Sequence, residues 1–199
     1  MVFWVRLLAV IVMLSGCGGG GGDSPGSGID PRIARLDIYD AQRIRVLGDP
    51  GAGVMGMAPT TSNLPVDGSA QFAGFATLRV EGAQPLVLFG DARLDIDFGA
   101  SAVSGAMTGF FGTVPGAGVQ DFAGEVTVTQ GHVARDLRLT YGGALSGGGQ
   151  QLALSGSMTG AFLGDPATAL SAADLDPVVV LNGVLRNGTL VLVTEIVAP

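Results

Sequence analysis

Polar and apolar residues alternate over much of this chain. In residues 91–98, DARLDIDF, every second side chain is apolar, and the positions between them are Asp91, Arg93, Asp95 and Asp97. A period of two is typical of a strand that is buried on one face only. The same alternation occurs in residues 125–130, 136–141 and 151–162, so we predict strands in these segments as well.

Short stretches rich in glycine, proline and aspartate separate the alternating segments. They divide residues 69–197 into about eight strands, which predicts an all-β domain, either a sandwich or a closed antiparallel barrel. Asn187-Gly188 suits a type I′ turn, because both central positions of that turn need positive φ. We therefore expect residues 184–186 and 189–191 to pair as a hairpin. The earlier segment 31–48 fits an amphipathic helix or a strand, and its pattern leaves both open.

A glycine-rich motif occurs twice, as SGAMTGFFG in residues 104–112 and as SGSMTGAFLG in residues 155–164. A phosphate-binding loop would need a helix after the glycines and, for nucleotides, a lysine or a distant acidic partner, and this chain has no lysine. Inward-facing glycines let barrel strands coil sharply and leave room for large side chains. We therefore interpret the motif as structural and expect one inward face in each copy: Val103, Gly105, Met107, Gly109 and Phe111, then Leu154, Gly156, Met158, Gly160 and Phe162.

The first residues have the pattern of a secretory signal peptide. Arg6 precedes an apolar run over residues 7–14, which is too short for a permanent membrane span. The following Leu14-Ser15-Gly16-Cys17 resembles the bacterial lipobox, whose cysteine is lipidated and becomes the first residue of the mature chain. We predict lipidation at Cys17; the alternative is a fortuitous cysteine at the end of a signal peptide. Because Cys17 is the chain's one cysteine, an intramolecular disulfide is excluded.

Residues 18–28, GGGGGDSPGSG, have the composition of a flexible tether. Gly18, rather than aspartate, follows the cysteine, and by resemblance to known sorting rules this indicates the outer membrane of a two-membrane bacterium. We divide the chain into a lipoprotein signal peptide (1–16), a lipidated cysteine with its tether (17–28), an N-terminal segment of open fold (29–63) and a β-barrel domain (64–199).

The charge of the chain argues against nucleic acid as a partner. The formal net charge is -7, and the basic residues, all arginine, are interleaved with carboxylates rather than gathered on a basic face. The one histidine, His132, stands beside a glycine and is expected to be an exposed turn residue, so we predict no catalytic triad and no histidine-based metal site. We expect no enzyme activity, no cofactor and no catalytic residue.

The carboxylates of residues 91–98 have two interpretations. Asp91, Asp95 and Asp97 share one strand face and would in principle hold Ca²⁺. The simpler interpretation is a charged face in water, because these residues alternate with apolar ones on a regular strand. We adopt the second interpretation and predict no metal site.

Three segments resemble the barrel domain of the transferrin-binding protein B family of surface lipoproteins. In residues 64–78 the matching positions are Pro65, Gly68, Ala70, Phe72 and Gly74; in residues 94–112 they are Asp97, Phe98, Gly99, Val103, Ser104 and Gly105; in residues 154–170 they are Gly160, Phe162, Gly164 and Ala167. The resemblance implies a single eight-stranded antiparallel barrel on a lipid tether at the outer membrane. Family members capture host proteins such as transferrin, haemoglobin or complement factor H.

The leading hypothesis is an outer-membrane lipoprotein at the cell surface, a monomer that is held to the membrane through Cys17. Its barrel would bind a host or environmental protein, or an iron- or haem-carrying ligand, in nutrient acquisition. The alternative is a structural or assembly lipoprotein that faces the periplasm and has no small-molecule ligand. A third possibility, a barrel that encloses a small apolar ligand, requires an interior cavity. The expected binding surface is the set of loops between strands.

Overall fold

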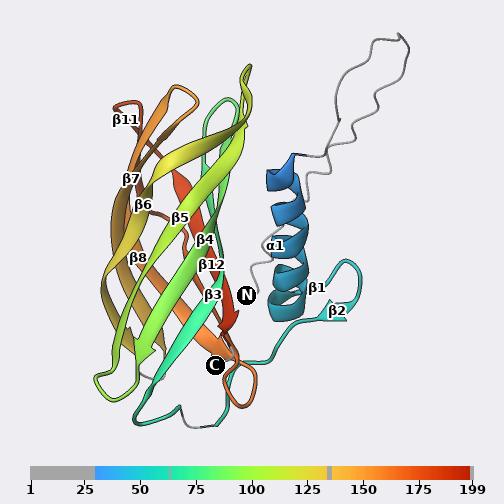
Figure 1. Ribbon diagram of the computed structural model, residues 1–199, viewed down its shortest axis with the longest axis vertical. Coiled ribbons are helices and arrows are strands. Elements are labelled where there is room, and N and C mark those ends of the chain that lie inside the picture. Colours follow the sequence, from blue (N-terminus) through green and yellow to red (C-terminus); the bar gives the residue numbers. More distant parts are fainter. Residues whose placement is uncertain (1–29, 63, 134–135, 198–199) are drawn as a thin grey trace, which may run out of the picture.

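Eight antiparallel strands close into a barrel in the computed structural model, which describes residues 30–62, 64–133 and 136–197. Each strand pairs with its neighbour along the chain, and pairings of β9 with both β8 and β12 complete the ring (Figure 1). The all-β, single-barrel prediction is therefore confirmed. The strands of the ring are β3 (Ser69–Val80), β4 (Leu86–Asp97), β5 (Ala102–Val114), β6 (Gly118–Val133), β7 (Leu137–Gly147), β8 (Gln150–Leu163), β9 (Ala169–Asp174) and β12 (Gly188–Ile196).

Apolar side chains of the alternating strands fill the barrel interior. In β4 the residues Ala92, Leu94 and Ile96 are buried, whereas the polar residues between them are exposed, as the period of two predicts. Every strand of the ring contributes to one buried cluster, whose large members include Phe72, Phe110, Phe162, Met107, Met158 and Tyr141. The chain's own side chains thus occupy the space that an enclosed apolar ligand would need.

The first copy of the glycine motif contains a β-bulge that the sequence pattern did not predict. Asp91 of β4 pairs with Thr108, but Phe89 pairs with Phe111, so β5 has one extra residue in this interval. Gly109 lies there with φ +60°, a conformation that glycine adopts without steric cost. The extra residue exchanges the two faces of the strand. Phe110 consequently belongs to the interior cluster, and the prediction that Gly109 and Phe111 face inward is wrong. A Cβ on Gly109 would lie nearest to Asp91 and Arg35 on the outer face.

The second copy of the motif has the predicted inward face. Leu154, Met158 and Phe162 all belong to the interior cluster. Gly156 lies directly opposite Tyr141 of β7, and a Cβ built on it would be 2.6 Å from the Tyr141 hydroxyl oxygen. The expectation that glycine leaves room for a large neighbour is therefore confirmed at Gly156.

A buried carboxylate bridges an interruption in the pairing of β8. β8 pairs with β9 over residues 159–163 and with β10 (Val178–Leu181) over residues 152–155, and the residues between lack a strand partner on that side. Asp174, at the end of β9, accepts hydrogen bonds from the Tyr141 hydroxyl (2.9 Å) and from the backbone N–H of Ser157 (2.9 Å). Burial, and then the bond to Asp174, raises the pKa of Tyr141 above its usual value.

The hairpin near the C-terminus forms at Asn182-Gly183, not at the predicted Asn187-Gly188. β10 pairs with β11 (Val184–Arg186), and the two central residues between them have φ of 51° and 80°, the left-handed values of a type I′ turn. The Asn182 side chain also accepts a hydrogen bond from the Gln151 N–H (2.9 Å). Gly188 instead begins β12 opposite Val80. The hairpin prediction was wrong because two Asn-Gly pairs compete here, and only the first separates strands that pair with each other.

Residues 31–48, whose fold the sequence left open, are mainly helical and lie against the outside of the barrel (Figure 1). α1 (Pro31–Leu47) begins after Asp30, whose carboxylate accepts from the Arg32 N–H, and it ends at Gly48 with φ 79°. Its buried residues, Tyr39, Gln42 and Val46, face the barrel wall. A short pair of strands follows, β1 (Gly48–Asp49) and β2 (Val54–Met55). In the part of the chain that the structure describes, no helix is both long and apolar enough to cross a bilayer.

The packing around Gly156 makes a stability prediction. In Gly156→Ala the new Cβ would lie 2.1 Å from the Asp174 carboxylate and would disrupt its bond to Tyr141. We expect the free energy of unfolding to fall by about 2 kcal/mol, the usual cost of overpacking a core. The control is Gly142→Ala in β7, where the nearest atom to the added Cβ is 3.8 Å away. Urea denaturation should show a change within about 0.5 kcal/mol for this control. Equal losses in the two variants would contradict the packing argument.

Candidate functional site

The residues that the sequence offered for chemistry are dispersed. Cys17 lies outside the described residues. His132 is exposed as expected, but it lies in β6 opposite Arg138 and not in a turn. Asp95 accepts a hydrogen bond from Gln71 (2.8 Å) on the outer face of the barrel. Within residues 30–62, 64–133 and 136–197, no three or more His, Cys, Asp or Glu side chains are grouped in a way that would hold a metal ion.

Asp91 is the exception, because it joins the barrel to α1. Its carboxylate forms an ion pair with Arg35 (2.8 Å) and accepts a hydrogen bond from the Tyr39 hydroxyl (2.5 Å). Arg35 also donates to the Tyr39 hydroxyl oxygen (2.8 Å), so the three side chains form a closed network. Burial and the bond to Asp91 raise the pKa of Tyr39 to about 12. Asp91 therefore holds the helix to the wall.

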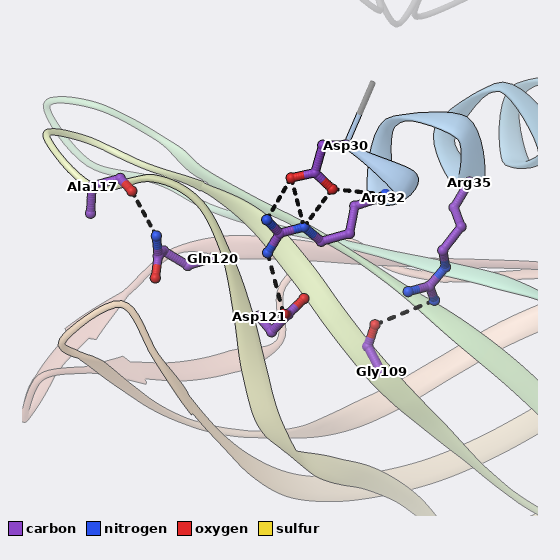
Figure 2. Close-up of polar contacts among 7 residues, drawn as sticks. All are labelled: Asp30, Arg32, Arg35, Gly109, Ala117, Gln120 and Asp121. Carbon is purple, nitrogen blue, oxygen red and sulfur yellow. Dashed lines mark hydrogen bonds and ion pairs between the residues drawn. The ribbon is translucent and has the colours of Figure 1, made fainter. Parts of the chain in front are cut away.

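A second ionic contact holds the first turn of α1. Arg32 lies between two carboxylates, with its side chain donating to Asp30 (2.8 Å) and forming an ion pair with Asp121 of β6 (3.3 Å), as Figure 2 shows. The hydrogen bonds from Arg32 lower the pKa of Asp30 to about 2. At the other end of the helix Arg45 pairs with Glu195 of β12 (2.6 Å). The Arg35–Asp91, Arg32–Asp121 and Arg45–Glu195 pairs each join a helix arginine to a barrel acid, and as surface ion pairs each contributes little alone.

Aromatic rings pack beside the Arg35–Asp91 ion pair. The Tyr39 ring stacks on Phe75 of β3, with centroids 5.1 Å apart and planes 19° from parallel. The Arg35 guanidinium lies 4.8 Å from the ring centroid of Phe111, the residue that the β5 bulge turns outward. Figure 2 also shows Arg35 reaching the carbonyl oxygen of Gly109 in that bulge (3.4 Å). The bulge thus supplies both an aromatic surface and a hydrogen-bond acceptor for the helix.

An apolar hollow remains between the first turns of α1 and the wall, and we call it the α1 groove. Its volume is about 210 Å³. Both walls carry apolar side chains: Ile33 and Leu36 from α1, Val87 and Phe89 from β4, Phe111 from β5 and Val119 from β6. Thr113 supplies the one hydroxyl in this lining. Such a surface fits an apolar group and offers little to a polar one.

The spacing of three residues in the sequence indicates this site, although the alternation of polar and apolar residues does not. Arg32, Arg35 and Tyr39 are spaced as neighbours on one side of a helix. Their partners Asp91 and Asp121 lie more than fifty residues away along the chain, in different strands. Such a network of ion pairs and hydrogen bonds can be recognised only once the strand order is known.

No family model matches the chain, and no curated protein matches it either. A function for this chain therefore has to be inferred from its residues and from their arrangement in the structure.

The Asp91 network predicts how Tyr39 titrates. In Asp91→Asn the negative charge beside the phenol is lost, so we expect the pKa of Tyr39 to fall from about 12 toward 10. The chain has two tyrosines, and the pKa of Tyr141 is also raised, by burial and by its bond to Asp174. Because Tyr141 is the more deeply buried of the two, we assign the first phenolate step in an ultraviolet titration to Tyr39. Asp95→Asn on the same strand face is the control and should leave this step unchanged, because Asp95 bonds to Gln71.

The same network sets the direction of a stability change at high pH. The folded state favours the neutral phenol of Tyr39, so its contribution is complete below pH 10 and is lost as the pH rises toward about 12. In Asp91→Asn this loss should be smaller. A first phenolate step that stays in place in Asp91→Asn would show that Asp91 does not act on Tyr39.

Proposed function

We propose that this chain is an outer-membrane lipoprotein of the transferrin-binding-protein-B-like type. In this proposal lipid at Cys17 anchors the chain, and the barrel binds a protein or an iron- or haem-carrying ligand at the cell surface in nutrient acquisition. The observation that carries the proposal is the closed eight-stranded antiparallel barrel, because it is the fold that the resemblance implied.

The distribution of side chains on the barrel supports a domain that stands in water beside a membrane. A barrel embedded in lipid carries an apolar band outside and polar residues within. Here the inner positions of β4 are Ala92, Leu94 and Ile96, and the outer ones include Arg93 and Asp95. An anchor separate from the barrel, such as lipid on Cys17, therefore fits this surface.

The long connection between β9 and β12 is the best candidate for contact with a protein partner. The other connections between successive ring strands have at most five residues, whereas this one spans residues 175–187 and includes the β10–β11 hairpin. It exposes Leu175 (74%) and Leu185 (68%) to solvent. Exposed apolar side chains grouped on a projecting element are typical of interaction sites.

The anchor and its location are tested in cells. We expect mass spectrometry of the mature protein to find acyl groups on Cys17, and we expect Cys17→Ser to release the protein from the membrane fraction. Protease added to intact cells should digest the barrel. Digestion only after the outer membrane is opened would instead favour the alternative, a structural or assembly lipoprotein that faces the periplasm.

The binding surface is tested with the purified chain. Pull-downs against haem, haemoglobin and iron carriers from culture medium should return a ligand. Leu185→Glu on the hairpin should weaken its binding by about tenfold, because it places a charge on an apolar contact. Val66→Glu, at an 85% exposed position outside the hairpin, should bind like the wild type. If no ligand is captured, or if both variants bind equally, binding through the hairpin is contradicted.

A further inference from the structure

The α1 groove has no assigned occupant, and its chemistry restricts what would fit. Ile33 forms part of one wall and is 45% exposed, so an apolar side chain borders an opening to solvent. The opposite wall is lined by Val87 and Phe89 of β4, Phe111 of β5 and Val119 of β6, which are three neighbouring strands. A ligand in the groove would be stabilised because apolar surface on both of its sides is removed from water.

The charges near the groove do not favour a ligand that carries an anionic head group. Arg32 and Arg35 are the nearby cations, and each is already paired with aspartate. The three partners, Asp30, Asp91 and Asp121, leave this cluster with one net negative charge. A free fatty acid or an anionic lipid would be repelled, whereas a neutral acyl chain would not.

The course of the chain places one such group within reach. Asp30 caps α1, and Ile33, one turn later, already lines the groove. Cys17 precedes Asp30 by 13 residues, and the intervening sequence is rich in glycine and serine. A glycine- and serine-rich chain of 13 residues has a root-mean-square end-to-end distance of about 20 Å, a length that would allow a group attached at Cys17 to reach the first turn of the helix.

We propose that the α1 groove holds an acyl chain of the lipid on Cys17 while the protein is in water. This inference rests on the proposed lipidation of Cys17. The acyl groups of a lipidated N-terminal cysteine are uncharged, which suits the surroundings of the groove. The groove covers only part of a long chain, whereas a bilayer covers all of it, so the chain leaves the groove when the protein reaches its membrane. The groove would then lower the exposure of the lipid during transit and would not compete with the final anchor.

The test compares two forms of the mature chain, residues 17–199. One carries its lipid, and the other is Cys17→Ser without lipid. The probe is a neutral pyrene-labelled monoacylglycerol, followed by fluorescence in detergent-free buffer at protein concentrations where light scattering shows monomers. We expect saturable binding by the Cys17→Ser form and binding at least about tenfold weaker by the lipidated form, whose groove is occupied. Equal binding by the two forms would overturn the inference.

Two isoleucines of α1 give a matched pair of variants in the Cys17→Ser background. Ile33 lines the groove, whereas Ile38, 65% exposed on the same helix, does not. Ile33→Glu should weaken probe binding by about tenfold, because a carboxylate would border the apolar walls. Ile38→Glu makes the same change in helix propensity and charge and should bind like its parent. Circular dichroism establishes that both variants are folded, and a similar loss in both would count against the groove as the site.

Further measurements separate the inference from the proposed function. If mass spectrometry finds no acyl group on Cys17 in cells, the lipid anchor fails and the inference fails with it. If Cys17 is lipidated but the probe binds both forms alike, only the inference fails. A pyrene-labelled fatty acid should bind the Cys17→Ser form more weakly than the neutral probe, and equal or tighter binding would overturn the assignment to a neutral chain.

Discussion

The structure depends on the closure of the ring between β8 and β9. This seam joins Thr159 to Ala173 and continues to Leu163 opposite Ala169, and it is built mostly from small residues. A Cβ on Gly160 would lie 2.3 Å from the Ser171 carbonyl oxygen, so a side chain at this position would clash with the paired strand. Closure pairs the strand edges around the ring and encloses the apolar faces of all eight strands. The outer wall that receives α1 is therefore a fixed surface.

The helix is bound to this wall much as a separate peptide would be. Tyr39 and Val46 supply the apolar contacts, and Gln42 donates to the Ala73 carbonyl oxygen (3.1 Å) beside Gly74, where a side chain would crowd it. Arginines of the helix meet acids of the barrel at both ends. The position of α1 is thus set by the sum of modest contacts, and the first turns remain far enough from the wall to leave the α1 groove.

The sequence predicted the barrel because its period of two is a local property that survives folding. It failed at Phe111, where one inserted residue at Gly109 exchanges the faces of β5, and an alternating pattern contains no marker for such an insertion. It also placed the hairpin at the wrong Asn-Gly, since the choice depends on which strands β10 and β12 join. The network of Arg32, Arg35 and Tyr39 with Asp91 and Asp121, like the α1 groove, combines residues from α1 and from different strands, so no single segment of the sequence could reveal either of them.

The place where α1 joins the rest of the chain determines how a mechanical load enters the molecule. A pull on the segment before Asp30, directed away from the wall, reaches the Arg32–Asp121 contact first and the Arg35–Asp91 contact next. These contacts then break one after another, as in peeling, and the Arg45–Glu195 pair breaks last. Once α1 has detached, the load next reaches the segment around Pro59 and Thr60, which is hydrogen-bonded to Phe162 and Gly164 at the end of β8. Under such a load the helix therefore detaches before the strands of the barrel separate.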